Sequence, residues 1–230
     1  TVTGGRLRTY GHGSEEFPMS KDMHIGILGA GNIGGPLGRH WAAAGHRVTF
    51  GSRDPGRLGS LVEPLGERAR AATYADAAGA SDIVLLSVPH PALDGLLRQL
   101  AGPLAGKTVI DATSPIGLSD DGLFVSVLEP GVTQGSWTAG HLPDSTVTRA
   151  FCHFPDELLW SRGTRQPHFW GMGTAADDPG AREVTETLVR DAGFVPVPLG
   201  GLEESAALDP GGALFGHVST PAGLRAAAGL

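Results

Sequence analysis

The sequence lacks the features that mark several large classes of protein. Its single cysteine, Cys152, excludes an internal disulfide and a multi-thiolate metal site, and is typical of a protein of the reducing cytoplasm. No apolar run reaches the roughly 18 to 20 residues that a membrane span needs. The nine histidines show no HExxH or other metal-ligand spacing, so we expect no metal site.

Positive charge is also scarce. The chain has 17 Lys and Arg against 24 Asp and Glu, which gives a formal net charge of −7. Because a phosphate backbone is bound by clustered Lys and Arg, this balance argues against a nucleic acid as the main partner. It leaves room for a local basic site that takes a small phosphorylated ligand.

Short apolar segments alternate with helical patterns from residue 24 onward. We expect strands over 24–28, 47–50, 82–88 and 108–112, separated by helices over 33–44, 58–69 and 93–100. This alternation predicts βαβ units, and therefore an α/β protein with a Rossmann doubly wound parallel sheet. Further along we expect strands over 147–151 and 168–172, a helix over 181–191, an apolar segment at 194–199 and a helix over 202–208.

A glycine-rich turn lies between the first expected strand and the first expected helix. It reads Gly29-Ala30-Gly31-Asn32-Ile33-Gly34. In a dinucleotide-binding turn the first glycine permits the tight bend, the second lets the backbone approach the pyrophosphate, and the third lets helix and strand pack closely. The turn therefore predicts a dinucleotide site at the helix N-terminus. The alternative is a structural glycine turn in a Rossmann-like fold that binds no nucleotide.

The end of the second expected strand favours NADP(H) over NAD(H). NAD sites carry an acid about 20 residues after the first glycine, where it accepts from the ribose 2′-hydroxyl. Here the strand ends in Gly51-Ser52-Arg53 without an acid, and Arg57 follows one helical turn later. Ser52 can donate to a 2′-phosphate, and Arg53 and Arg57 can pair with it. The alternative makes Arg53 a solvated surface charge paired with Asp54.

Two further strand ends are expected to line the path from the adenosine to the nicotinamide. Ligands of open α/β sheets sit at the carboxyl ends of the strands. The third strand is followed by Ser87-Val88-Pro89-His90, and the fourth contains or precedes Ala112 and Thr113. Both segments are also compatible with plain turns.

These patterns divide the chain into three expected parts. Residues 1–22 are rich in Gly and polar residues and lack the apolar centre of a signal peptide, so we expect a flexible N-terminal extension without chemistry. Residues 23–145 are expected to form the NADP-binding Rossmann domain. Residues 146–230 are expected to form a smaller C-terminal region that covers the substrate or second cofactor.

The sequence resembles the NADPH-dependent coenzyme F420 oxidoreductase family. The likeness rests on the segments IGILGAGNIG, GSR at 51–53, DIVLLSVP, the Asp-Ala-Thr-Ser-Pro stretch at 111–115, and late segments near 192–203 and 207–210. The resemblance implies that NADPH and the deazaflavin F420 lie face to face at the crevice and exchange hydride. It also implies that Ser52 and Arg53 take the 2′-phosphate, that the C-terminal region covers the second ligand, and that the protein is a homodimer.

One segment departs from the family's pattern. The family has a Lys-Ala-Phe-Asn-Thr-like strand end beside the nicotinamide, whereas this chain has Arg149-Ala-Phe-Cys152-His153. A carbonyl, imine or conjugated alkene needs a proton donor as well as hydride. We expect His153 to be that donor, with His90 and His141 as weaker candidates. The alternative gives His153 a packing role.

Three functions remain open at this point. The first is a cytoplasmic NADP-dependent oxidoreductase that passes hydride between NADPH and F420. The second keeps the fold and NADPH but reduces a small organic substrate, such as an imine, carbonyl or conjugated alkene, in a biosynthetic pathway. The third is a non-enzymatic NADP(H) sensor. The resemblance favours an enzyme. The Cys152-His153 pair departs from the family's pattern and therefore favours the second function over the first.

Overall fold

The computed structural model describes residues 22–161 and 169–230. The expected extension 1–22 lies outside the described residues except for Asp22. The strands are β1 His24–Leu28, β2 Arg47–Gly51, β3 Ala69–Ala72, β4 Ile83–Leu86, β5 Thr108–Asp111, β6 Ile116–Leu118, β7 Phe124–Ser126, β8 Thr146–Arg149, β9 Gly171–Ala176 and β10 Val195–Gly200. The α-helices are α1 Gly34–Ala43, α2 Gly59–Val62, α3 Tyr74–Gly79, α4 Leu93–Leu104, α5 Gln134–His141, α6 Asp156–Ser161, α7 Pro179–Asp191 and α8 Pro221–Ala227. Four 3-10 turns are η1 Pro55–Leu58, η2 Glu63–Arg68, η3 His90–Ala92 and η4 Glu204–Leu208.

Eight of these strands form one sheet, in the order β10-β9-β8-β5-β4-β1-β2-β3. The strands from β8 to β3 are all parallel. The chain runs outward from β1 through β2 to β3 and then returns to the other side of β1 as β4. The switch point therefore lies between β1 and β4, where open α/β folds bind their ligands. The predicted Rossmann doubly wound sheet is confirmed.

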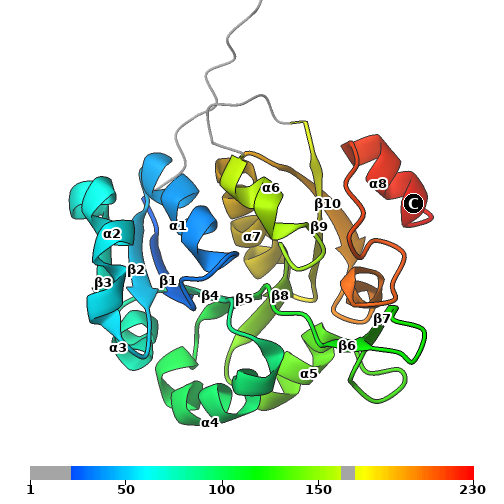
Figure 1. Cartoon of the computed structure of the whole chain (residues 1–230), viewed down its shortest axis with the longest axis horizontal. Helices are drawn as coiled ribbons and strands as arrows, with labels where there is room; N and C mark the ends of the chain where they lie inside the picture. Colours follow the sequence, from blue (N-terminus) through cyan, green and yellow to red (C-terminus); the bar gives the residue numbers. More distant parts are fainter. Residues whose placement is uncertain (1–21, 162–168) are drawn as a thin grey trace, which may run out of the picture.

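Helices cover both faces of the sheet, as Figure 1 shows, with α1, α6 and α7 on one face and α3, α4 and α5 on the other. The strands are apolar on both faces because both are covered. Ile25 and Ile27 of β1 point into the cluster that contains Trp41 of α1, whereas Leu28 belongs to the opposite cluster. Because these strands are parallel, their carboxyl ends all lie at the same side of the sheet, which is called the carboxyl edge below.

The strands β9 and β10 extend past the carboxyl ends of the parallel strands. β9 is antiparallel to β8 and pairs with it only through Thr148 and Arg149, whose partners are Ala176 and Ala175. The earlier residues of β9 therefore lie past the end of β8, and β10 runs parallel beside them. A third apolar cluster joins this part to α8. Strands on both sides of residue 145 share one sheet, and the division into two parts there stays a prediction.

Several expected elements differ from the structure, each for a local reason. The helix expected over 58–69 is a series of short turns followed by β3, because Pro64 restricts the backbone and Gly66 adopts φ +59°. The strand expected over 147–151 ends at Arg149, because Phe151 adopts φ +65°. The helix expected over 202–208 is a 3-10 turn. The strand expected over 168–172 begins at Gly171, and residue 168 lies outside the described residues.

No helix among residues 22–161 and 169–230 is long and apolar enough to cross a membrane. The same part of the chain contains no group of three or more His, Cys, Asp or Glu side chains that could hold a metal ion.

Candidate functional site

Two glycines of the turn after β1 are required by close packing. Gly29 has φ +109°, and a Cβ atom placed on it would lie 2.5 Å from the carbonyl oxygen of Ser87. A Cβ atom on Gly34 would lie 2.0 Å from the Gly29 carbonyl oxygen. The Ser87 hydroxyl donates to that same carbonyl at 2.7 Å. These contacts fix the turn between β1 and α1 and leave no room for larger residues at either glycine.

Gly31 is different, because a Cβ atom there would meet no heavy atom within 4 Å. The space above Gly31 is open, and Asn32 beside it is exposed. The helix α1 begins at Gly34. Gly35 already donates its N–H to the Gly31 carbonyl at 2.9 Å and Pro36 has no N–H, so Gly34 carries the first-turn amide that is left for a ligand. A concave turn with one bare glycine and a helix N-terminus has the shape and the donors that a pyrophosphate needs. The residues present therefore fit a dinucleotide.

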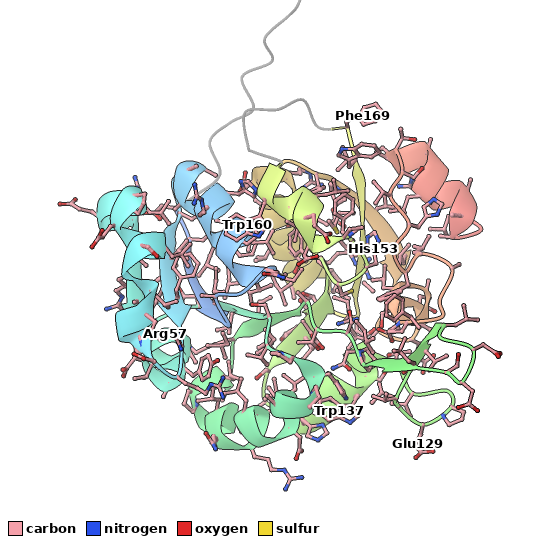
Figure 2. All side chains as sticks on the ribbon, viewed as in Figure 1. Arg57, Glu129, Trp137, His153, Trp160 and Phe169 are labelled. Carbon is pink, nitrogen blue, oxygen red and sulfur yellow. The ribbon has the colours of Figure 1, made fainter. Side chains whose placement is uncertain are left out.

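The end of β2 lies beside this turn, because β1 and β2 are neighbours in the sheet. Asp54 donates its main-chain N–H to the Ser52 hydroxyl at 3.1 Å, which folds a tight bend around Arg53. Arg53 and Arg57 are exposed, and neither has a partner among the described residues. Figure 2 shows Arg57 on the outer side of the β2–β3 region. The pairing of Arg53 with Asp54 that the sequence left open is absent here.

The ends of β4 and β5 lie on the other side of β1. Val88, Ala112 and Thr113 are buried, and the Thr113 hydroxyl donates to Asp111 Oδ1 at 2.7 Å rather than facing the crevice. Pro89 is exposed and His90 is half-buried. Burial lowers the pKa of His90, and the neighbouring Asp111 and Gln134 oppose this shift.

All the predicted site residues thus follow the carboxyl ends of five adjacent strands, β8, β5, β4, β1 and β2. They include the six residues of the turn, Ser52, Arg53 and Arg57 after β2, residues 87–90 after β4, residues 112 and 113 after β5, and His153 after β8. The structure brings them to one edge. Their contacts with a cofactor stay predictions.

His153 is placed in the interior rather than in the crevice. Its side chain is 2% exposed, and Nε2 accepts the main-chain N–H of Gly173 at 3.0 Å. Burial lowers the pKa of His153 to about 4, so the ring is neutral near pH 7. Burial likewise raises the pKa of the Cys152 thiol to about 12. These features favour a packing role for His153, and the proton-donor role stays a prediction. Figure 2 shows His153 among the C-terminal elements.

His141 lies on the outer side of α5. Its ring stacks on Trp137 with centroids 3.9 Å apart, and Nε2 lies 3.3 Å from Asp94 Oδ1 of α4. Trp137 in turn stands between His141 and His90, whose ring centroid is 5.3 Å from that of Trp137. Of the three histidines considered as donors, His90 lies nearest the strand ends with part of its ring exposed.

A buried ionic cluster behind the strand ends was not foreseen. Arg149 is fully buried. Its Nη1 donates to the carbonyl oxygens of Asp111 and Thr113 at 3.0 and 2.7 Å, and its Nη2 donates to Asp209 Oδ1 at 2.7 Å. Burial alone would lower the pKa of Arg149, but Cys152, Asp111 and Asp209 raise it above its ordinary value. Charged residues at the ends of two apolar strands, Asp111 and Arg149, were the signal available in the sequence.

Gln134 connects this cluster to α5. Its main-chain N–H donates to Asp209 Oδ2 at 2.8 Å, and its side-chain amide donates to Thr138 Oγ1 at 3.0 Å. Thr138 donates in turn to Asp111 Oδ2 at 2.6 Å. The cluster therefore ties the ends of β5 and β8 to α5 and to the residues after η4, and it holds the floor of the crevice in place.

Trp160 of α6 lies at the rim of the glycine turn. A Cβ atom on Gly35 would lie 3.3 Å from its ring, and Arg39 of α1 lies over the ring with Cζ 5.8 Å from the centroid. The side chain is 49% exposed. Figure 2 shows Trp160 between α1 and α6. An exposed aromatic ring thus stands next to the first turn of α1.

The fold and this edge define a protein of the Rossmann class, and a family model matches its core. Residues 24–115, which run from β1 to just past β5, match the family described as NADP oxidoreductase coenzyme F420-dependent. The resemblance predicted from the sequence is thereby confirmed over this segment. The family description and the names of the curated relatives are those of NADP oxidoreductases and F420-dependent NADP reductases.

Individual relatives agree with this assignment. The F420-dependent NADP reductase of Methanothermobacter marburgensis is 34% identical over 102 residues, which cover 41% of this chain and 46% of that protein. A hypothetical protein from Sinorhizobium meliloti has the same fold, with a TM-score of 0.73, 23% identity, and coverage of 87% of this chain and 96% of that one. A candidate F420-dependent NADP reductase from Arthrobacter sp. FB24 has a TM-score of 0.66, 22% identity, and coverage of 78% and 86%.

The match to curated relatives is partial. The chain spans about half the length of the curated relatives it matches. The two solved structures are below 25% identical, so they support the fold alone.

Proposed function

We propose that the chain binds NADP(H) at the carboxyl edge of β1, β2, β4 and β5 and transfers hydride between the nicotinamide and a second molecule. The observation that carries the proposal is the end of β2, which lies beside a glycine turn that fits a pyrophosphate. Two exposed guanidinium groups, Arg53 and Arg57, follow this strand, and neither has a partner among residues 22–161 and 169–230. A carboxylate at this position would repel a 2′-phosphate, whereas a guanidinium pairs with it in a forked geometry.

Different residues bind different parts of the cofactor. The open space above Gly31 receives the pyrophosphate beside the amide of Gly34, and Ser87 keeps the turn in shape through its hydrogen bond to Gly29. The ends of β4 and β5 form the floor for the nicotinamide, which the buried Arg149 cluster makes rigid. When bound, NADPH supplies the hydride, and the protein supplies alignment and exclusion of water.

Coenzyme F420 is the first candidate for the second molecule. The match to the F420-dependent family over residues 24–115 supports it. The extension of β9 and β10 past the end of β8 supplies a wall beside the crevice. The exposed ring of Trp160 offers an aromatic surface on the other side, which suits a planar ligand.

A small organic substrate is the second candidate. The observation that favours it is the end of β8, where Cys152 and His153 replace the polar pair of the family's pattern and are both buried. Such a substrate also needs a proton, and the half-buried His90 at the end of β4 is better placed to deliver it than His153.

The test mixes the purified chain with NADPH and oxidised F420 and follows the absorbance of both. We expect F420 reduction with equal consumption of NADPH. If NADPH binds but F420 stays oxidised, the second candidate replaces the first, and His90→Ala and His153→Ala are compared on a panel of imines and carbonyls. Binding without turnover of any acceptor would favour a sensor. A homodimer and a cytoplasmic location are further parts of this proposal, and light scattering of the purified chain tests the dimer.

A further inference from the structure

A basic pocket lies at the opposite edge of the sheet from the glycine turn. It is formed by the amino-terminal ends of β1, β2 and β3 and by the end of η2, and it encloses about 310 Å³. Figure 1 shows these three strands side by side at one end of the sheet. The pocket is lined by His24, Arg47, Val48, Thr49, Glu67, Arg68, Ala69 and Arg70.

The pocket exists because the helix on this face is short. α3 has six residues and packs over the other halves of the strands, where Cβ atoms on Gly26 and Gly51 would contact Ala77. The amino-terminal halves of β1 and β2 are left to polar side chains. Thr49 is fully buried there, and its hydroxyl lies 3.1 Å from Arg70 Nε and 2.9 Å from His24 Nε2. A buried threonine thus fixes the Arg70 guanidinium and the His24 ring in the floor.

Three guanidinium groups converge on the pocket, and a carboxylate already lies between two of them. Asp22 Oδ2 is 3.6 Å from Arg47 Nε and 3.6 Å from Arg68 Nη1. All three of these side chains are about half exposed, so water screens the pairs strongly. Two guanidinium groups therefore border one position that an anionic group can occupy, although Arg68 Nη1 also donates to the carbonyl oxygen of Gly45. Arg70 lines the same pocket.

The charged groups around His24 determine the net charge of the pocket. Burial lowers the pKa of His24, and Arg47 and Arg70 lower it further, whereas Asp82 and Asp22 oppose the shift only partly. Glu67 is the acid that lines the pocket itself. In a chain with a net charge of −7, three arginines around one cavity form a local positive region.

We infer that this pocket is a second anion-binding site, distinct from the dinucleotide crevice, that takes a small free phosphorylated molecule. The phosphoryl group displaces the Asp22 carboxylate from Arg47 and Arg68 and reaches Arg70. Guanidinium groups bind phosphate oxygens through charge-assisted, forked hydrogen bonds, which are stronger than the screened contacts with a flexible carboxylate. The volume admits a phosphate with a modest organic part.

The test titrates inorganic pyrophosphate, by calorimetry at low salt, into the chain saturated with NADPH, so that the glycine turn is already occupied. We expect saturable binding that Arg70→Gln and Arg47→Gln each weaken about tenfold or more. The matched control is Arg98→Gln, which removes an exposed arginine of α4 that is paired with Asp94, and it should leave binding unchanged. Asp22→Asn should strengthen binding, because it removes the competing carboxylate.

Two further readouts keep the result clear. The affinity for NADPH should be unchanged in Arg47→Gln, and the circular dichroism spectrum should show that the variant is folded. The pKa of His24, followed by proton NMR, should rise when pyrophosphate is added. No saturable binding, equal weakening in Arg98→Gln, or loss of binding only when NADPH is added would each overturn the inference.

Discussion

The glycines of the turn after β1 perform different tasks, and single substitutions separate them. Gly29 and Gly34 are enclosed, because a Cβ atom on either would lie within 2.5 Å of a main-chain oxygen. Gly31 faces open space. Substitution of the first two therefore disturbs the fold, whereas substitution of Gly31 acts on the bound phosphate alone.

We predict that Gly31→Ala leaves the melting temperature nearly unchanged and weakens NADPH binding at least about tenfold, because the methyl group fills the space that the pyrophosphate approaches. Fluorescence titration and a thermal melt measure the two effects. Gly95→Ala is the matched control, since a Cβ atom there also meets nothing within 4 Å. An unchanged NADPH affinity in Gly31→Ala would remove the phosphate from this turn.

His153 gives a prediction for the dependence of stability on pH. Its folded pKa is about 4 and its ordinary value is 6.5. The unfolded chain therefore takes up a proton at this residue before the folded chain does. Stability contributed by the neutral ring is present above pH 6.5 and is lost as the pH falls toward 4, by roughly 3 kcal/mol at most.

The variant His153→Gln isolates this effect, because an amide oxygen can still accept from Gly173 but does not titrate. The free energy of unfolding, measured in urea between pH 7 and pH 4, should fall less steeply in the variant than in the wild type. Parallel slopes would contradict the assignment of a buried neutral histidine. Asp209, whose pKa burial raises, contributes equally to both curves and cancels in the difference.

Among the elements, the buried ionic cluster joins parts of the chain that are distant in sequence. Arg149 of β8 bonds to Asp111 at the end of β5 and to Asp209 after η4, and Asp209 also accepts from the first residue of α5. Removing the guanidinium leaves two buried carboxylates without a cation.

We predict that Arg149→Met destabilises the chain by about 3–5 kcal/mol, the usual cost of breaking a buried ion pair from one side. Urea unfolding measures the effect. Arg98→Met removes an exposed pair with Asp94 and should cost less than about 1 kcal/mol. Similar losses of stability in both variants would show that the buried cluster stabilises the fold no more than an exposed ion pair does.

The elements that could be predicted from the sequence are those with a local signal. β1, β2, β4 and β5 are mostly buried, contain short apolar runs and come before glycine or polar turns, so their patterns stand out. β3, with the sequence ARAA, is half-buried at the sheet edge and carries no apolar run. The β6–β7 hairpin is exposed and short, and its pairing depends on contacts across a loop rather than on periodicity.

At the scale of the whole molecule, the parts of the site that the sequence predicts are contiguous motifs, and the parts that it does not predict are contacts between residues distant in sequence. The glycine turn and the end of β2 are contiguous motifs, and the parallel order of strands brings them together, so the sequence predicts their edge. The Arg149 cluster combines residues 111, 134, 149 and 209, and no local pattern links them. His153 was placed beside the nicotinamide by strand alignment, but the left-handed backbone at Phe151 ends the strand and leads His153 into the interior.

The two edges of the sheet therefore carry different chemistry. The carboxyl edge holds the glycine turn and the exposed Arg53 and Arg57 after β2, and β9 and β10 extend past the end of β8. The amino edge of β1, β2 and β3 holds the basic pocket.

The proposal that Arg53 binds the 2′-phosphate of NADP(H) is tested by measuring the affinities of the wild type and of Arg53→Ala for NADPH and NADH. Arg53 is exposed and has no partner in the part of the chain that the structure describes, so its removal should leave the fold intact. We expect the wild type to bind NADPH more tightly than NADH. We expect Arg53→Ala to weaken NADPH binding about ten- to a hundredfold and to change NADH binding less than about twofold. Equal losses for the two cofactors, or a wild type that binds NADH as tightly as NADPH, would contradict the proposal.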